Sequence, residues 1–263
     1  MPVGRISRSI SKISRAEQGL DVFDASKAGA WGSFGWSALN FPDCVVWHKA
    51  STIPLNYGAP IPHSSDILGN MSVTQVTGSA RPVYGVSAGK PCMIFDGVQQ
   101  FISTWDPVNT VSLNKIVVPD VTTAYLVFRN LNTNDATRHA MANIGFASTK
   151  IAMSVEWATG TYGLGGANYG ELTGGTPDVG TKHIMCGVVN GASSILGIDG
   201  QEFTGTTTVN VGASELHFGA RYLPNLFWKG EIYEFILYTG AHNNVTRSLI
   251  YKALGAEHTI PVR

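Results

Sequence analysis

The sequence predicts an all-β chain folded as an antiparallel sandwich, and three observations lead to this prediction. Short apolar segments recur from residue 122 onward, separated by turns that contain glycine or asparagine. Two of these turns, Asn190-Gly191 and Asp199-Gly200, have the dipeptides that two-residue hairpins prefer. The last segment alone in this region has a helical apolar pattern. All-β sandwiches of 263 residues are commonly single domains.

Residues 1–41 differ from the rest and are predicted to form an N-terminal arm, extended or helical. Isoleucines recur at helical spacing among basic residues, and aromatic rings then alternate with glycines. Either the arm folds back and completes the sandwich core, or it docks on a partner or a neighbouring copy. The residues assigned to this assembly arm are Arg5, Ile6, Arg8, Ile10, Lys12, Ile13, Arg15, Trp31, Phe34 and Trp36.

The sandwich is predicted to occupy residues 42–263 and to begin with a strand at Val46-Trp47. Further on, the apolar runs 92–95 and 101–102 flank an Asp96-Gly97 turn, which predicts a hairpin. The later strands are expected at residues 124–128, 141–146, 151–157, 184–189, 194–198 and 216–218, and an exposed threonine-rich strand is expected at 206–208, between the last two of these. Residues 184–208 should form an antiparallel meander.

The C-terminal unit combines a long strand with a short helix. The strand is expected at residues 228–238, with Glu231 and Glu234 on opposite faces because they are three residues apart. Asn243 or Asn244 would cap the helix at its start, and Gly255 is placed to end it.

These segments resemble the concanavalin A-like (laminin-G-like) jelly-roll domain. The matching residues are Val46-Trp47, Leu68-Gly69-Asn70, Arg81-Pro82, Phe95-Asp96-Gly97 and the closing stretch 228–238 with its helix. The resemblance covers about residues 44–260 and implies a jelly-roll β-sandwich. It is specific for the fold, whereas activity depends on the site that a given fold presents.

Composition narrows the function classes. A formal net charge of zero removes the long-range field that would recruit nucleic acid or an anionic membrane across the whole surface. Cys44, Cys92 and Cys186 lack metal-ligand spacing, and we interpret Cys92 and Cys186 as small buried hydrophobes. No signal peptide and no membrane insertion are expected.

No enzymatic pattern was found, so we expect a protein without catalytic activity. Glucanases of the resembled superfamily have carboxylates at alternate strand positions, and this sequence has no such string. Glu234 is interpreted as a structural or paired residue. No cofactor or metal is expected. Some lectins of this fold bind calcium through acidic loops. Candidate oxygens are present here at Asp96, Asp106, Asp120 and Asp199, but these residues do not form a dense acidic loop, so the sequence leaves calcium binding possible without supporting it.

The remaining candidate site is the glycine-rich, aromatic segment 157–175 together with residues 221–222 and 227–228. Aromatic faces stack on sugar rings, and polar groups beside them fix the orientation of the sugar. An alternative is that these rings pack onto the sandwich or onto another subunit. The candidate glycan-binding residues are Trp157, Tyr162, Asn168, Tyr169, Glu171 and Tyr222.

Together the arm and the lectin-like domain resemble bacteriophage virion proteins of the tail-fibre, head-fibre or capsid-decoration kind. The resemblance implies a non-enzymatic homo-oligomer, with a trimer as one option, assembled in the host cytoplasm and located in the virion. The arm would bind other virion proteins, and the sandwich would contact host surface glycan. The alternative is a bacterial carbohydrate-binding module or a glycoside hydrolase of the same superfamily.

Overall fold

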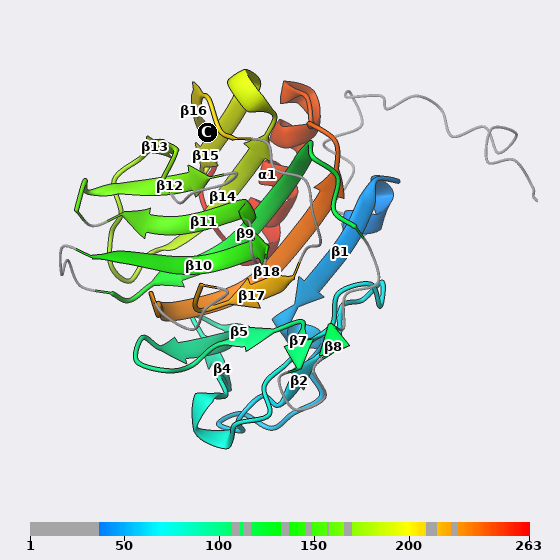
Figure 1. The fold of residues 1–263 in the computed structure, drawn as a ribbon, viewed down its shortest axis with the longest axis vertical. Coiled ribbons are helices and arrows are strands. Elements are labelled where there is room, and N and C mark those ends of the chain that lie inside the picture. Colours follow the sequence, from blue (N-terminus) through cyan, green and yellow to red (C-terminus); the bar gives the residue numbers. More distant parts are fainter. Residues whose placement is uncertain are drawn as a thin grey trace, which may run out of the picture. The chain divides into compact units, whose positions relative to one another are not determined.

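The computed structural model describes residues 37–106, 111–112, 117–132, 137–145, 149–156, 158–165, 170–208, 215–221 and 226–263. The residues assigned to the assembly arm lie outside these ranges. Within them, two antiparallel sheets face each other, and a helix follows the last strand. Figure 1 shows the strands of one sheet crossing in front of those of the other. The predicted all-β antiparallel sandwich with a C-terminal helix is confirmed.

Sheet A carries the longest strand of the fold at its centre. Strand β18 pairs with β9 along one side, while β5 and β1 share its other side, one at each end. The strands of sheet A, in spatial order, are β16 (Gln201–Gly205), β15 (Ser194–Ile198), β14 (Lys182–Val189), β9 (Thr122–Asn130), β18 (Lys229–Thr239), β5 (Lys90–Asp96) and β4 (Val83–Ser87), with β1 (Cys44–Lys49) on β18.

Sheet B packs against sheet A and consists of shorter strands. In spatial order they are β13 (Leu172–Gly174), β12 (Thr161–Gly165), β11 (Thr149–Glu156), β10 (Arg138–Gly145), β17 (Leu216–Phe218), β6 (Ile102–Ser103), β3 (Val73–Thr74) and β2 (His63–Ser64). A two-stranded ribbon joins β7 (Trp105–Asp106) and β8 (Val111–Ser112), and the short 3-10 helices are η3 (Ala38–Asn40), η4 (Ala50–Thr52), η5 (Gly78–Ala80) and η6 (Gly191–Ser193).

The core lies between the sheets, and sheet A is covered on its second face as well. On β9, Ala124, Leu126 and Phe128 point into the core. Tyr125, between them, points to the opposite face, where its ring meets Tyr251 of the helix edge-on at 6.0 Å. Strand β9 is therefore apolar at successive positions, because both of its faces are buried.

Helix α1 (Asn244–His258) covers that second face and runs further than predicted. Asn243 is the N-cap, since its side chain accepts a hydrogen bond from Thr246 N. The prediction that Gly255 ends the helix is wrong. Thr259 ends it in the left-handed conformation, and Gly255 lies inside, where the returning tail would crowd a side chain: a Cβ at this position would lie 2.8 Å from the Ile260 carbonyl oxygen.

The predicted hairpin at Asp96-Gly97 is only half right. The turn exists, with Gly97 at φ 78° and Asp96 Oδ1 accepting hydrogen bonds from the next amides. However, β5 pairs within sheet A and β6 within sheet B, so the turn carries the chain from one sheet to the other. A turn signal predicts a reversal of direction, but the partner of each strand is decided by long-range packing.

The two later turn signals are confirmed as hairpins. Strands β14, β15 and β16 form the expected meander, with Asp199 and Gly200 both at positive φ between the last two. The threonine-rich stretch 206–208 is not a strand, because β16 ends at Gly205. Thr206 and Thr208 are exposed as expected, but Thr207 is buried. Its hydroxyl lies 2.7 Å from the Ser194 hydroxyl.

The expected placement of Glu231 and Glu234 on opposite faces of a strand is also wrong. A β-bulge interrupts β18 between Ile232 and Glu234. It shifts the alternation by one residue, so both carboxylates point to the outer face of sheet A. Glu231 accepts a hydrogen bond from the Tyr233 hydroxyl there, and Glu234 lies beneath α1. The interpretation of Glu234 as a paired, structural residue is confirmed.

Candidate functional site

The outer face of sheet B, the face turned away from the core, carries a row of small and polar side chains. On β11, Ile151, Met153 and Val155 point into the core. Because side chains alternate along a strand, Ser154 and Glu156 point outward. A buried carboxylate on the outer face of a sheet needs partners, and these define the candidate site.

We call Arg138, Ser154 and Glu156 the Glu156 group. Arg138 lies directly opposite Glu156 on β10, and its Nε donates to Glu156 Oε2 at 2.5 Å. The Ser154 hydroxyl donates to the other carboxylate oxygen, Oε1, also at 2.5 Å. The Glu156 side chain is 7% exposed and that of Arg138 is 40% exposed. The carboxylate is thus held in one orientation, at the border between the interior and solvent.

Two glycines make room for this arrangement. A Cβ at Gly163, on the neighbouring strand β12, would lie 2.7 Å from Ser154 Oγ and 2.8 Å from Glu156 Cγ. A Cβ at Gly170 would lie 3.1 Å from Glu156 Cδ and 3.4 Å from an Arg138 nitrogen. Gly170 closes the connection between β12 and β13, so the glycine-rich segment identified in the sequence meets the Glu156 group.

Leu226, which lies between the predicted pairs 221–222 and 227–228, reaches the same face. It packs against Ala140 and Ala152, which lie on the outer side of β10 and β11. Its carbonyl oxygen accepts a hydrogen bond from Ala140 N at 3.0 Å. The predicted Trp228, in contrast, is buried in the core.

The structure describes two of the six candidate glycan-binding residues, Tyr162 and Glu171. Trp157, Asn168, Tyr169 and Tyr222 lie outside the described residues. Glu171 is half-buried, and its Oε2 accepts a hydrogen bond from Thr208 N at 2.7 Å. The Tyr162 ring is fully buried in the core, where burial raises the pKa of its hydroxyl. Tyr162 therefore offers no open ring face for a sugar.

Sequence reasoning missed the Arg138–Glu156 pair, although a signal was present. Arg138 and His139 follow the asparagine-rich stretch 130–134, a composition that is typical of a solvated hairpin tip. Instead, His139 is buried, with its Nδ1 2.6 Å from the Phe227 carbonyl oxygen. Antiparallel pairing of the two predicted strands, 141–146 and 151–157, would have placed opposite charges face to face. The register of that pair was the missing information.

A second group lies further along the same face of sheet B. Asn143 of β10 and His217 of β17 are directly opposite each other, and Glu215 precedes β17. All three are buried. We call them the His217 group.

The outer face of sheet A holds a separate polar cluster beneath α1. Glu234 accepts a hydrogen bond from Trp47 Nε1 at 2.6 Å and lies 2.8 Å from His258 Nε2. Glu257 forms an ion pair with Lys49. Each of these carboxylates has a partner from β1 or α1, so the cluster serves to dock the helix on the sheet.

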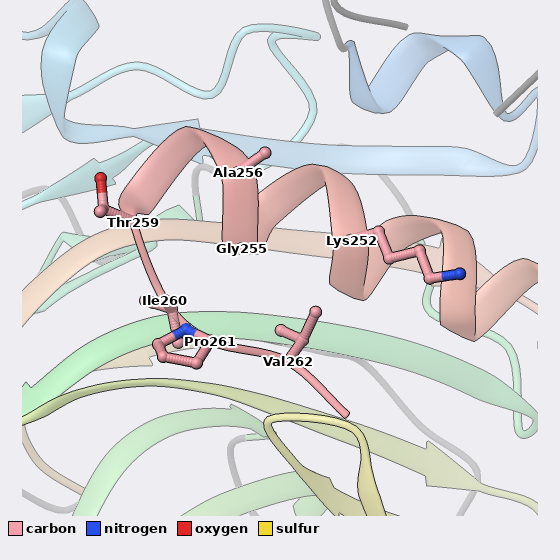
Figure 2. Close-up of a pocket in the computed structure, with 7 residues that line it drawn as sticks. All are labelled: Lys252, Gly255, Ala256, Thr259, Ile260, Pro261 and Val262. Carbon is pink, nitrogen blue, oxygen red and sulfur yellow. The ribbon is translucent and has the colours of Figure 1, made fainter. Parts of the chain in front are cut away.

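A groove of about 370 Å³ lies between α1 and the tail that follows it. Figure 2 shows the tail, from Ile260 to Val262, running back beneath the helix. The groove has one charged side chain, Lys252, and no member of the Glu156 group borders it. Its lining is Lys252, Gly255, Ala256, Thr259, Ile260, Pro261 and Val262.

The cysteines behave as the sequence predicted. Cys92 and Cys186 are fully buried, and burial raises the pKa of each thiol to about 12. Such thiols are poor nucleophiles and poor ligands near neutral pH. No helix among the described residues is both long and apolar enough to cross a membrane.

Comparisons with known proteins identify relatives of the fold. No protein-family model matches the sequence, and no curated protein matches it. Among solved structures, Trypanosoma rangeli sialidase in complex with sialic acid aligns over 86% of this chain, at 12% identity and a TM-score of 0.57. The alignment covers 35% of the sialidase, so this chain spans about a third of that enzyme's length.

Two further structures are domains of larger proteins. Domain 4 of AbnA, an extracellular GH43 arabinanase of Geobacillus stearothermophilus in complex with arabinotriose, aligns over 80% of this chain and 98% of its own, with 18% identity and a TM-score of 0.55. The binding domain of botulinum neurotoxin DC in complex with SialylT aligns over 81% of this chain and 51% of its own, with 8% identity and a TM-score of 0.53. At these identities the likeness concerns the fold alone, an antiparallel β-sandwich.

Proposed function

We propose that this chain is a non-enzymatic carbohydrate-binding protein whose glycan site is centred on the Glu156 group. The observation that carries the proposal is the orientation of the Glu156 carboxylate by Ser154 and Arg138 beside Gly163 and Gly170 of the glycine-rich segment. A fixed carboxylate accepts hydrogen bonds from sugar hydroxyls, and the partly exposed guanidinium beside it donates them. Preorganised polar groups of this kind give a sugar site its orientation.

Residues that neighbour this group in the sequence, most of them aromatic, would complete the proposed site. Trp157 follows Glu156 directly in the sequence, Asn168 and Tyr169 precede Gly170, and Tyr222 belongs to the stretch that ends at Leu226. Rings at these positions would stack on the apolar faces of sugar rings while the Glu156 group binds hydroxyls. The ligands bound in the structural relatives, sialic acid and arabinotriose, support a carbohydrate as the ligand class.

A binding role fits the Glu156 group better than hydrolysis. Glycosidases of the common type use two carboxyl groups, one as acid and one as base or nucleophile. Here both oxygens of Glu156 are hydrogen-bonded, to Arg138 and Ser154, which suits an oriented acceptor. We therefore expect no release of reducing ends when the chain is incubated with the glycans that it binds.

A glycan array followed by calorimetry tests the site. Wild-type chain should bind at least one glycan class, and Glu156→Gln should weaken that binding about tenfold or more, because it removes a charged hydrogen bond. Trp157→Ala tests the stacking residue in the same assay. Glu257→Gln is the matched control, since Glu257 is an ion-paired carboxylate on α1, outside sheet B. Unchanged binding by both Glu156→Gln and Trp157→Ala, with the variants folded, would refute this site.

The second part of the proposal concerns where the protein works. We infer a bacteriophage virion component, a tail fibre, head fibre or capsid decoration, in which the arm binds other virion proteins and the sandwich contacts host glycan. Support comes from the basic, isoleucine-containing arm and the lectin-like sandwich that follows it. The chain would be a homo-oligomer, with a trimer as one option.

Native mass measurements on the full chain and on a chain lacking residues 1–36 test the arm. Oligomers of the full chain beside monomers of the shortened chain would support assembly through the arm. Monomers of both would remove this support while leaving the carbohydrate proposal intact. The alternative, a bacterial carbohydrate-binding module or glycoside hydrolase, is favoured by the extent of the match to the arabinanase domain, and release of reducing ends would select the hydrolase.

A further inference from the structure

The His217 group contains several buried polar atoms that have no hydrogen-bond partner among the described residues. Asn143 is 0% exposed, His217 2% and Glu215 6%. Leu216 and Phe218, on either side of His217, point into the core, so His217 points to the outer face of sheet B. Asn143 lies on the same face, because directly opposed residues on paired strands share a face.

Four polar atoms of this group have no hydrogen-bond partner among the residues that the structure describes. They are Asn143 Oδ1, Glu215 Oε2 and both ring nitrogens of His217. Buried polar atoms in folded proteins are nearly always satisfied by protein, water or an ion. A cluster of buried atoms without hydrogen-bond partners therefore points to a small bound ligand.

The chemical nature of these atoms indicates which ligand they would bind. A carboxylate oxygen, an amide oxygen and the lone pair of a neutral imidazole are all electron-pair donors, and the group includes a negative charge. These are ligands of a divalent cation, and the imidazole favours an ion of the zinc class over calcium or magnesium.

The geometry agrees with a shared ion. His217 Nε2 and Glu215 Oε2 are 3.7 Å apart, which is too long for a hydrogen bond. Two ligands of one tetrahedral zinc ion, each bonded at about 2.0–2.1 Å, lie about 3.4 Å apart. A shift of a few tenths of an ångström would thus bring both atoms onto one ion. Across β10 and β17, Asn143 faces the same space.

We propose that Asn143, Glu215 and His217 form a binding site for a divalent cation of the zinc class. The site is separate from the Glu156 group, and it would stabilise the junction of β10 and β17 by joining the two strands. Among the residues that the structure describes, Glu234, Glu257 and His258 form another cluster with metal-ligand composition, which is the natural competitor. Its carboxylates are already paired with Trp47, His258 and Lys49, which favours the His217 group.

The first test measures zinc and cobalt binding by the full chain. Metal-free protein is titrated with Zn²⁺ alone in a calorimeter, and zinc retained after dialysis is measured by mass spectrometry. Titration with Co²⁺ should give the visible absorption of a low-coordinate site that contains nitrogen. We expect close to one ion per chain and a higher unfolding temperature with Zn²⁺ present, because binding to the folded state alone stabilises it.

Variants locate the ion. His217→Gln and Glu215→Gln should each lower the zinc affinity at least tenfold and abolish the cobalt band. His63→Gln, at an exposed histidine, and His258→Gln, in the competing cluster, should keep both signals. The proposal is overturned if wild-type chain retains no zinc, or if His258→Gln rather than His217→Gln removes it. The wild-type measurements decide the question even if a variant fails to fold.

Discussion

At the scale of single residues, buried side chains with several hydrogen bonds do most to fix this fold. Asp66 is one of them: its carboxylate accepts hydrogen bonds from the backbone amides of Trp47, Leu68, Asn70 and Met71. It thereby ties the loop between β2 and β3 to β1. The loop 68–70 matched the family pattern in the sequence, whereas Asp66, which organises it, was not identified.

Replacing Asp66 by alanine should destabilise the chain strongly. The amides of Trp47 and Met71 are buried, and each unsatisfied buried donor costs about 1–3 kcal/mol. We expect a loss of about 3 kcal/mol in the free energy of unfolding, measured with urea. Asp96→Ala is the control, because Asp96 also accepts from three amides, but at a more exposed turn. Equal losses in the two variants would contradict this explanation.

The interactions of His183 in sheet A make the stability of the fold depend on pH. Its Nδ1 lies 2.6 Å from Asp199 Oδ2 and its Nε2 lies 3.0 Å from Asp178 Oδ1. Burial disfavours the charged imidazole, but the hydrogen bonds and charges of Asp199 and Asp178 outweigh it and raise the pKa of His183. Since this pKa is raised above the unfolded value of about 6.5, the interaction stabilises fully below that pH. Its contribution is lost as the pH rises through the folded-state pKa.

His183→Gln should therefore cost most stability in mild acid. The difference in unfolding free energy between wild type and variant should be largest near about pH 5 and should shrink toward about pH 9. Urea unfolding at several pH values measures it. Burial lowers the pKa of His48 and of His242, but both residues are present in both chains, so their effects cancel in the difference. A difference that does not vary with pH would rule out this mechanism.

At the scale of elements, close contacts between backbone and side chain set the packing of α1 on sheet A. Tyr251 of the helix lies over Gly197 of β15: a Cβ at Gly197 would lie 2.0 Å from the Tyr251 hydroxyl oxygen. Arg247, one turn earlier, forms two hydrogen bonds of 2.6 Å with Glu202 of β16. The helix is thus held by a steric fit and by an ion pair.

Gly197→Ala should loosen this contact. Because Tyr251 is rigid and buried, the added methyl must displace the ring or the helix, and overpacking of this kind costs about 1–3 kcal/mol. Thermal unfolding measures the loss. Gly78→Ala is the matched control, since a Cβ there meets nothing within 4 Å and φ is not positive. Stability of Gly197→Ala equal to that of Gly78→Ala would contradict the packing described.

At the scale of the whole molecule, the packing of the described sandwich begins at its first residues, 37–41. Ala38 is fully buried, and the Phe41 ring meets Tyr238 edge-on at 6.0 Å. The Tyr238 hydroxyl also donates to the Ala38 carbonyl oxygen at 3.4 Å. Residues 37–41, which the sequence prediction assigned to the arm, therefore pack on β18 in this structure.

Two truncations should separate the arm from the sandwich. Deleting residues 1–36 should leave the free energy of unfolding within about 0.5 kcal/mol of the full chain, because the described core is kept. Deleting residues 1–41 also removes the buried Phe41 ring and should cost about 3 kcal/mol. Chemical unfolding of both shortened chains as monomers measures the difference. Equal stability of the two would show that residues 37–41 contribute no packing energy.

The sequence by itself determined the local features of this protein. The turns at Asn190-Gly191 and Asp199-Gly200, a helix cap at Asn243 or Asn244 and the burial of Cys92 and Cys186 follow from backbone preferences and hydrophobicity, which act over a few residues. The sandwich class followed from the same local signals, combined with a resemblance of short motifs.

Only the tertiary structure decided which distant residues meet. The turn at Asp96 joins two sheets instead of two paired strands, and the bulge in β18 turns Glu231 to the same face as Glu234. The Glu156 and His217 groups exist because the register of β10 against β11 and β17 sets Arg138 and Asn143 opposite their partners. Register is a global property: it depends on which pairing buries the whole apolar face, and no short segment contains that information.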